Sequence, residues 1–169
     1  GNALRCMGKY LYDFGIVRKE ELAIETGSGI KTVSLYTSDD KVTSACVDMG
    51  RATLDTEALR FSIPEKTVVN YPVRIAGRPY SITCVDMGNP HCVVFCSRVD
   101  GVDVARIGPQ FEHAPYFPDR INTEFIRVVN PSTIKMRVWE RGSGETLACG
   151  SGACAAVVAA VAGGHCSKG

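Results

Sequence analysis

The order of apolar and polar positions first predicts a helix and then a series of short strands. Residues 1–15 have apolar side chains at helical spacing, followed by a glycine stop: Leu4, Met7, Leu11, Phe14 and Gly15. From residue 22 onward the pattern alternates with a period of two, which predicts an antiparallel meander with strands at 22–26, 30–37 and 41–49. The first third of the chain is therefore expected to be one helix beside a small sheet.

The rest of the chain has the same strand-rich pattern, with a plausible boundary near Pro64. Strands are predicted at 67–75, 80–85, 91–96, 125–129 and 133–139. A short helix is expected at 102–107, followed by a loop rich in proline and aromatic residues at 108–120. A last helix is predicted in the apolar run 155–162, which two glycines stop. The pattern as a whole indicates an α+β protein.

Composition narrows the class of protein. The chain has 169 residues, of which 45% are hydrophobic and 22% charged, which is typical of a globular protein. A formal charge of +1 gives no basic surface for nucleic acid or anionic membranes. No apolar run reaches the roughly 18 residues of a membrane span, and no leader pattern stands at the N-terminus. We therefore expect a cytoplasmic protein whose partner is a small molecule.

Eight cysteines are present, at positions 6, 46, 84, 92, 96, 149, 154 and 166. A disulfide framework is typical of short secreted chains with small cores, and this chain is neither. Cys92 and Cys96 are predicted on one face of a strand, but without a second ligand pair they do not favour a zinc site. Most of the cysteines are therefore expected to be small core residues.

Cys149 differs because of its surroundings, since it stands where a loop is predicted to become a helix. The first N–H groups of a helix have no internal partner, and Gly150 and Gly152 are expected to let the backbone curl so that these donors converge on an anion. The helix dipole and these donors predict a lowered pKa for the Cys149 thiol, beside a site for a substrate carboxylate.

This stretch has three alternative interpretations. The glycines can form a simple tight turn before a closely packed helix, with Cys149 an inert buried thiol. The spacing Gly150-x-Gly152-x-x-Ala155 half-matches a dinucleotide-binding fingerprint, but no acidic residue follows about twenty positions later. A nucleophile elbow is absent, because Cys149 stands where that motif has its first glycine.

Two internal echoes suggest related halves. Residues 1–6 and 150–154 are both small-residue turns that lead into a predicted helix with a cysteine in its first turn, and the segment 47–50 repeats as 85–88. If the halves are related, the counterpart of Cys149 precedes Gly1, and further strands follow Gly169. The chain is therefore expected to be a fragment of a two-lobed protein, truncated at both ends.

The motifs resemble those of the diaminopimelate epimerase family over nearly the whole chain. The run from Glu140-Arg141 through Cys149 to Cys154 is similar to that family's second catalytic motif. Three further segments fall where the family has its other signatures: Gly88-Asn89-Pro90-His91, Phe117-Pro118-x-Arg120-x-Asn122 and Gly1-Asn2-x-x-Arg5-Cys6. The resemblance implies two similar α+β lobes of antiparallel or mixed sheet around a central helix, with the active site between them. It divides this chain into a partial first lobe, 1–54, and a second lobe, 55–169, that lacks its last strands.

The resemblance implies that LL- and meso-diaminopimelate are interconverted without a cofactor or metal, for lysine and peptidoglycan precursors. One cysteine thiolate removes the α-proton of the substrate, and a second cysteine thiol returns a proton on the opposite face. Cys149 would be one of the two, and the other would precede Gly1. The chain as given is therefore expected to be inactive, although the full-length protein would be active.

The resemblance also implies roles for other residues. Glu140 and His91 join Cys149 as catalytic residues, and Glu140 with Arg141 suits the substrate's ammonium and carboxylate groups. The expected substrate-binding residues are Gly1, Asn2, Asn89, Asn122, Glu140, Arg141, Gly150 and Ser151. Taken singly, each has a structural alternative, because glycine and asparagine are common in turns and a Glu-Arg pair is usually solvated.

Two rival functions remain open from the sequence. A proline racemase-like enzyme shares the two-cysteine logic, but its acidic and serine-proline context before the second cysteine is absent here, where residues 145–148 stand. A lobe that binds a ligand without catalysis, with structural cysteines, is the other. Missing strands would leave a sheet edge open to a second copy, so a homodimer is a further expectation.

Overall fold

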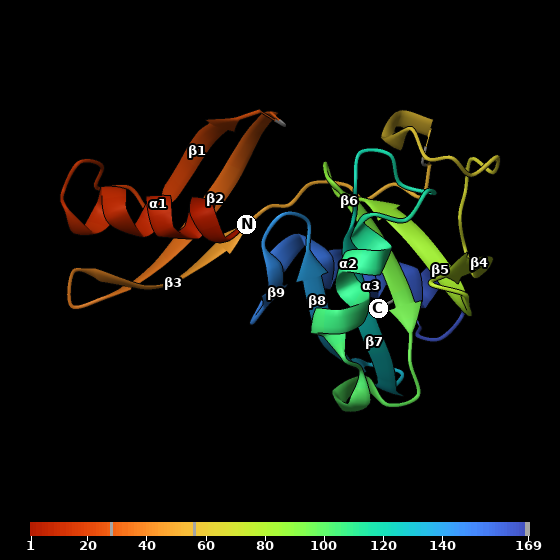
Figure 1. Cartoon of the computed structure of the whole chain (residues 1–169). Coiled ribbons are helices and arrows are strands. Elements are labelled where there is room, and N and C mark those ends of the chain that lie inside the picture. Colours follow the sequence, from red (N-terminus) through yellow and green to blue (C-terminus); the bar gives the residue numbers. More distant parts are fainter. Residues whose placement is uncertain (28, 56, 168–169) are drawn as a thin grey trace. The chain divides into compact units, whose positions relative to one another are not determined.

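The computed structural model describes residues 1–27, 29–55 and 57–167. The chain divides into an N-terminal unit, residues 1–51, and a C-terminal unit, residues 52–169. Each unit has its own sheet: three strands in the order β1-β2-β3, and six strands in the order β4-β5-β6-β7-β8-β9 (Figure 1). Helices packed on mostly antiparallel sheets confirm the predicted α+β class, whereas the expected similarity of the two lobes stays a prediction.

The N-terminal unit is one helix packed on an antiparallel meander, as predicted. Its elements are α1 (Asn2–Asp13), β1 (Glu21–Thr26), β2 (Gly29–Ser38) and β3 (Lys41–Val47). The hairpin between β2 and β3 turns through Asp39 and Asp40, both at positive φ, which is the backbone of a tight two-residue turn. A small core lies between helix and sheet: Tyr12, Leu22, Val33, Leu35 and Val42.

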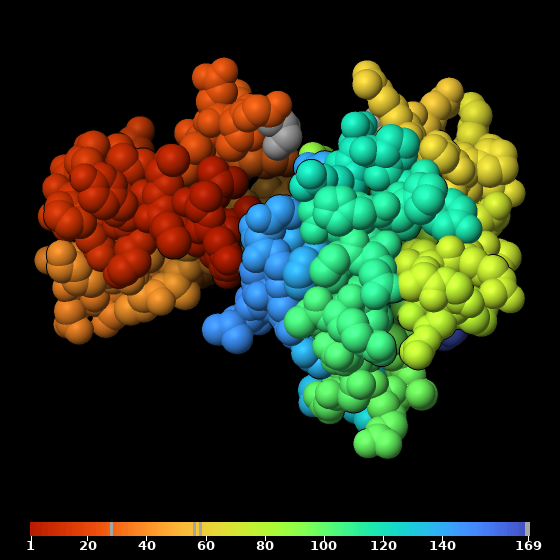
Figure 2. All heavy atoms as spheres, in the orientation of Figure 1, coloured from red at the N-terminus to blue at the C-terminus, as the bar shows by residue number. Residues whose placement is uncertain are grey.

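The face of α1 that packs on the sheet differs in part from the predicted one. Gly8 lies so close to the sheet that a Cβ there would stand 2.9 Å from Cδ2 of Leu35. Leu4 and Leu11 flank this contact, but Met7 and Phe14 face outward, with Phe14 72% exposed. The outer side of α1 is uncovered within its own unit (Figure 2). The helical spacing was therefore right, but the small residue Gly8 marks the line of closest packing.

The C-terminal unit is a six-stranded sheet with one helix on each face. The strands are β4 (Tyr71–Ile75), β5 (Arg78–Asp86), β6 (Pro90–Phe95), β7 (Asn122–Asn130), β8 (Thr133–Glu140) and β9 (Gly144–Thr146). All neighbours are antiparallel except β6 and β7, which are parallel. The crossover between these two carries α2 (Val104–Glu112), and α3 (Gly150–Ala162) follows β9. Short 3-10 helices occupy Glu57–Leu59 and Val99–Gly101.

The main core lies between the sheet and α2. Phe111 of α2 is fully buried and makes edge contacts with the rings of Tyr80 and Phe125, at centroid distances of 4.9 and 5.4 Å. On the other face, α3 packs through residues at helical spacing: Gly152, Ala155, Ala156, Ala159 and Ala160. These small side chains bring the α3 backbone close to the sheet.

Several boundaries differ from the predictions, and two of these differences have a clear physical reason. The helix predicted at 102–107 extends to Glu112 and contains Pro109, because burial of Phe111 and Glu112 outweighs the missing N–H of a proline inside a helix. The strand predicted from residue 67 starts at Tyr71, because Asn70 has a φ of 51° and breaks the extended backbone.

The repeated segments 47–50 and 85–88 form the same turn. Asp48 accepts a hydrogen bond from the Gly50 N–H at 2.8 Å, and Asp86 accepts one from the Gly88 N–H at 2.7 Å. Both glycines have positive φ, at 78° and 85°. The sequence echo is therefore a local structural repeat, at the exits of β3 and β5.

Candidate functional site

The strand register places four polar side chains on the face of the sheet that α3 covers. Three belong to predicted site residues, and the fourth is Glu124. His91 of β6 is paired with Asn122 of β7, and Glu124 of β7 is paired with Val138 of β8. Since side chains alternate between faces with a period of two, His91, Asn122, Glu124 and Glu140 share one face. The opposite face carries Trp139, which lies against α2. Glu124 and Glu140 of this face lie near the start of α3, where Cys149 stands.

Cys149 is the N-cap residue of α3. Its backbone is extended, with φ −130° and ψ 113°, and its sulfur accepts a hydrogen bond from the Gly152 N–H at 3.4 Å. The sulfur also lies 3.6 Å from Oγ of Ser151. Within the first turn, the N–H groups of Gly150 and Ser151 have no intrahelical partner. The prediction that Cys149 stands at a helix N-terminus is thus confirmed.

The reason for glycine at 152 is not the one predicted. Neither Gly150 nor Gly152 has the positive φ that a curled glycine turn requires. A Cβ at Gly152 would stand 2.5 Å from Oε1 of Glu124 and 3.2 Å from the Cys149 sulfur, whereas a Cβ at Gly150 would meet open space. Glycine is therefore needed at position 152 because α3 lies so close to a buried carboxyl group that a side chain would not fit.

Hydrogen bonds connect that carboxyl group to the Cys149 sulfur. Oε1 of Glu124 lies 2.7 Å from Nδ1 of His91, and both side chains are 0% exposed. Nε2 of His91 lies 3.1 Å from Oδ1 of Asn89. The Asn89 amide donates to Ser151 Oγ at 3.5 Å, and Ser151 reaches the sulfur. We call these five residues, from Glu124 to Cys149, the sulfur chain.

The predicted direction of the Cys149 pKa is wrong for this arrangement. Burial raises the pKa of the Cys149 thiol, because the sulfur is taken out of water, and the carboxylates of Glu140 and Glu124 raise it further. The bonds from Ser151 and the Gly152 N–H lower it, but they do not outweigh burial. Cys149 therefore favours the thiol form over the thiolate.

The remaining predicted residues of this unit are held by the protein itself. Asn122 donates to the Pro90 carbonyl at 2.8 Å and accepts from the Arg141 N–H at 2.9 Å. Glu140 is half-buried and accepts a hydrogen bond from the Thr146 hydroxyl. The exposed Arg141 guanidinium donates to the Asp119 carbonyl at 3.0 Å. Asn122 thus fixes the turn that carries Arg141, and its role toward a substrate stays a prediction.

Gly1 and Asn2 belong to the N-terminal unit. Gly1 is the N-cap of α1 without a side-chain cap, and the Asn2 amide oxygen accepts a hydrogen bond from the Arg5 guanidinium. Both residues are exposed. The segment therefore opens a helix, as predicted, and its N-terminal N–H groups are available to an anion.

Glu124 is the site residue that sequence reasoning missed. It sits in the middle of β7, whose neighbouring positions Thr123 and Phe125 are also fully buried. An ionisable residue among buried positions is a signal of function or pairing. The family signatures did not single it out.

The cysteines are less buried than predicted. Three of the eight are buried, namely Cys84, Cys92 and Cys149, and all eight are free thiols. Within the described ranges, no three His, Cys, Asp or Glu side chains are grouped so that they could hold a metal ion.

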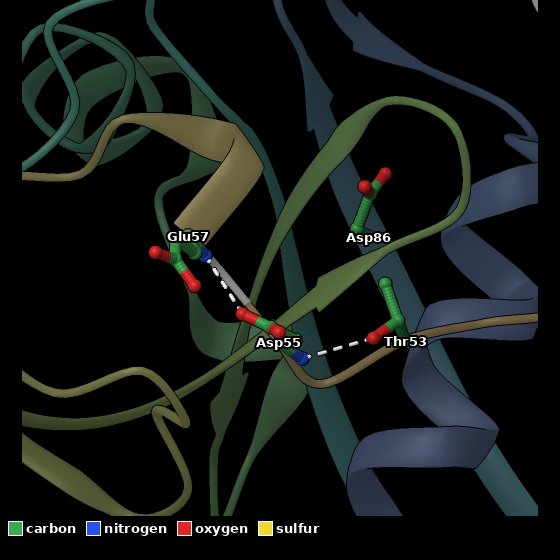
Figure 3. Close-up of a pocket in the computed structure, with 4 residues that line it drawn as sticks. All are labelled: Thr53, Asp55, Glu57 and Asp86. Carbon is green, nitrogen blue, oxygen red and sulfur yellow. Dashed lines mark hydrogen bonds between the residues drawn. The ribbon is translucent and has the colours of Figure 1, made fainter.

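A separate acidic pocket lies outside this site. It has a volume of about 400 Å³ and is lined by Thr53, Asp55, Glu57 and Asp86 (Figure 3). Asp55 caps a local turn by accepting from the Glu57 N–H at 3.0 Å, and Glu57 pairs with Lys66 at 2.9 Å. These carboxylates have structural partners, and none of the predicted site residues lines the pocket.

Sequence comparison relates the chain to known proteins. A family model described as diaminopimelate epimerase matches residues 83–168. The diaminopimelate epimerase of Desulfovibrio desulfuricans is 48% identical over 99% of this chain and 61% of its own length. That of Acetivibrio thermocellus is 48% identical over 95% of this chain and 58% of its length. The chain thus spans about three fifths of the length of these curated relatives.

Structural comparison finds the same fold in more distant enzymes. A probable proline racemase from Agrobacterium radiobacter has a TM-score of 0.72 and 13% identity, over all of this chain and 54% of its own. A hydroxyproline epimerase from Agrobacterium vitis has a TM-score of 0.69 and 12% identity, over 97% of this chain and 52% of its own. Identities this low support the shared fold alone. Within the described part of the chain, no helix has the length and apolarity to cross a membrane.

Proposed function

The chain belongs to the diaminopimelate epimerase family, and from this we propose that the protein interconverts LL- and meso-diaminopimelate for lysine and peptidoglycan precursors. The observation that carries the proposal is Cys149, whose sulfur caps α3 beside two free backbone N–H groups and at the end of a hydrogen-bonded chain. Inversion at a carbon that bears a proton needs an acid and a base on opposite faces, and a thiol at Cys149 is suited to one of these roles.

The reaction proceeds by two proton transfers. A thiolate takes the α-proton, and the electron pair of the broken C–H bond stays on the α-carbon, delocalised into the carboxylate. The Cys149 thiol then gives its proton to the opposite face of that carbon and becomes a thiolate. Burial raises the pKa of Cys149, which keeps the sulfur protonated and ready to act as the donor. In the reverse direction the two sulfurs exchange roles.

The negative charge that develops on the substrate is stabilised by donors already in place. The N–H groups of Gly150 and Ser151 point to the N-terminal end of α3, where a carboxylate is favoured by both the free donors and the helix dipole. Gly1 and Asn2 would offer equivalent donors at the start of α1. Arg141 and Glu140 suit the substrate's carboxylate and ammonium groups. Asn89 and Asn122 would contact its far end through spare amide capacity.

The proposal is tested by proton exchange at the α-carbon. Incubation of the purified natural-length protein with LL-diaminopimelate in heavy water is expected to give meso-diaminopimelate that carries deuterium at the inverted carbon. Proline serves as the comparison substrate. Exchange with proline but not with diaminopimelate would move the assignment to the proline racemase-like activity. Exchange with neither would favour a ligand-binding protein.

A second thiol is required by this chemistry, and the family resemblance assigns that role to none of the residues 1–169. We therefore propose that residues 1–169, expressed alone, do not exchange the α-proton. Turnover of either stereoisomer by this polypeptide would contradict that statement.

A further inference from the structure

Glu124 is a buried carboxyl group for which the proposed reaction has no use. Its side chain is 0% exposed, and Oε1 is bound to His91. Oε2 has no hydrogen-bond partner among the described residues. An ionisable group in such a place destabilises the fold, because its charged form loses hydration that a single hydrogen bond does not replace.

The direction of the hydrogen bonds in the sulfur chain follows from the chemistry of its members. The Asn89 amide nitrogen donates to Ser151, so its oxygen faces His91. A carbonyl oxygen only accepts, so Nε2 of His91 must carry a hydrogen. Ser151 Oγ accepts from Asn89, which leaves the hydroxyl hydrogen free to point at the Cys149 sulfur. Every donor from His91 onward therefore points toward the sulfur.

Glu124 fixes this direction. With Nε2 protonated, Nδ1 and Oε1 of Glu124 share one further proton across 2.7 Å. Whether that proton lies on nitrogen or on oxygen, the pair is neutral overall. Its loss would leave a net negative charge, fully buried and with one oxygen unpartnered. The pair therefore keeps its proton, and His91 keeps its Nε2–H toward Asn89.

We propose that Glu124 is a positioning residue for Cys149: it holds His91 so that the sulfur chain ends in a Ser151 hydroxyl that donates to the sulfur and stabilises its thiolate. The inference rests on the proposed function for its purpose, since proton transfer requires Cys149 to pass through the thiolate form. Its test does not need turnover, so the two can fail independently.

A simple charge effect predicts the opposite result. The titratable groups around the Cys149 sulfur are Glu124 on β7, Glu140 on β8 and His91 on β6. A negative charge on Glu124 disfavours the thiolate, so its removal alone would make the thiolate easier to form. If Glu124 acts by positioning, its removal makes the thiolate harder to form. The sign of the change therefore separates the two roles.

The experiment measures alkylation of Cys149 by iodoacetamide as a function of pH in the natural-length protein. Trypsin is expected to release residues 142–168 as one peptide, which carries Cys149, Cys154 and Cys166. Fragmentation in the mass spectrometer assigns the modified site, and Cys154 on the same helix is an internal reference. Only the thiolate is alkylated, so the midpoint of the curve reports the thiolate fraction.

Two substitutions of Glu124 give different expectations. Glu124→Gln can donate its amide hydrogen to Nδ1 of a neutral imidazole, which keeps Nε2–H in place, so the midpoint is expected to stay at the wild-type value. Glu124→Leu cannot bind Nδ1, so the midpoint is expected to move to higher pH. The alkylation rate of Cys149 at a pH below the midpoint is then expected to fall by up to about tenfold, the effect of weakening one hydrogen bond to a charged acceptor. A midpoint that stays or moves to lower pH in Glu124→Leu overturns the proposal.

A matched control is available in the same unit. Glu112 is also a buried glutamate, but it binds Trp139 and Gly142 and no member of the sulfur chain. Glu112→Gln is expected to leave the Cys149 midpoint unchanged. If Glu112→Gln shifted the Cys149 midpoint as much as Glu124→Leu, replacement of any buried glutamate would change the midpoint by destabilising the fold. The proposal would then be wrong.

A double-mutant cycle tests the path of the effect. Ser151→Ala removes the last donor and is expected to raise the midpoint as Glu124→Leu does, whereas the double substitution adds little because the chain is already broken. Full additivity would contradict transmission through Ser151. If Glu124→Leu does not fold, as judged by Trp139 fluorescence, Glu124→Gln and Ser151→Ala decide the matter. The proposal then requires an unshifted midpoint in the first and a raised one in the second.

Discussion

Replacement of Gly152 by alanine tests the close contact on which the site depends. The added Cβ would stand 2.5 Å from Oε1 of Glu124, whereas carbon and its neighbours normally pack at about 3.5 Å. Glu124 would have to move by about 1 Å. That displacement takes Oε1 out of reach of His91, because their 2.7 Å bond would pass the usual limit of about 3.2 Å.

The expected cost follows from two opposing effects. Loss of a hydrogen bond to a charged partner costs about 1.5–3 kcal/mol. Alanine in place of glycine favours a helix by about 1 kcal/mol. The bond is the larger effect, so Gly152→Ala is expected to lower the free energy of unfolding of the C-terminal unit by about 0.5–2 kcal/mol.

Gly150→Ala is the matched control, because it adds the same methyl group in the same helical turn but meets open space. It is expected to leave the free energy of unfolding unchanged or to raise it by up to about 1 kcal/mol. Urea unfolding can be followed through Trp139, which is the only tryptophan in the chain and lies in the C-terminal unit, so the signal reports on that unit. If Gly152→Ala is as stable as Gly150→Ala, the contact with Glu124 is not tight and the reasoning fails.

Two further predictions concern protonation. Burial alone would raise the pKa of Glu112, but the hydrogen bonds from Trp139 and the Gly142 N–H outweigh it, and the pKa is lowered. The charged Glu112 side chain therefore stabilises the fold above pH 4.5, and this stabilisation is lost as the pH falls through the lowered pKa of Glu112. Urea midpoints should therefore fall more steeply below pH 4.5 in the wild type than in Glu112→Gln, and parallel curves would contradict this. Burial and then the Glu140 carboxylate raise the pKa of Cys149, so Glu140→Gln should move the alkylation curve of Cys149 to lower pH, and an unmoved curve would show that this charge does not reach the sulfur.

Local sequence patterns were sufficient to predict most of the elements. Alternation of period two located the three strands of the N-terminal meander, and the glycine-rich loop before an alanine run placed Cys149 at a helix start. Both patterns are properties of a few consecutive residues. The extension of the helix predicted at 102–107 through Pro109 was missed, because its stability comes from Phe111, which packs against residues of distant strands.

The chemistry of the site was harder to predict, because it depends on long-range pairing. Glu124 and His91 lie 33 positions apart, and only the parallel register of β6 and β7 brings them together. The pKa of Cys149 was predicted in the wrong direction for a similar reason. The helix N-terminus is visible in the sequence, whereas the burial that dominates the pKa results from packing of α3 on the sheet.

The central claim is that the Cys149 sulfur transfers the proton at the α-carbon. The most direct measurement compares Cys149→Ser with Cys154→Ser in the natural-length protein, by deuterium incorporation into LL-diaminopimelate in heavy water. Cys154 lies on the same helix five positions later and is also a free thiol, which makes it a matched control. The account predicts that the exchange rate of Cys149→Ser is at least about a hundredfold below the wild-type rate, which is the usual contribution of a positioned acid or base. Cys154→Ser is expected to exchange at the wild-type rate. Exchange that survives in Cys149→Ser would contradict it.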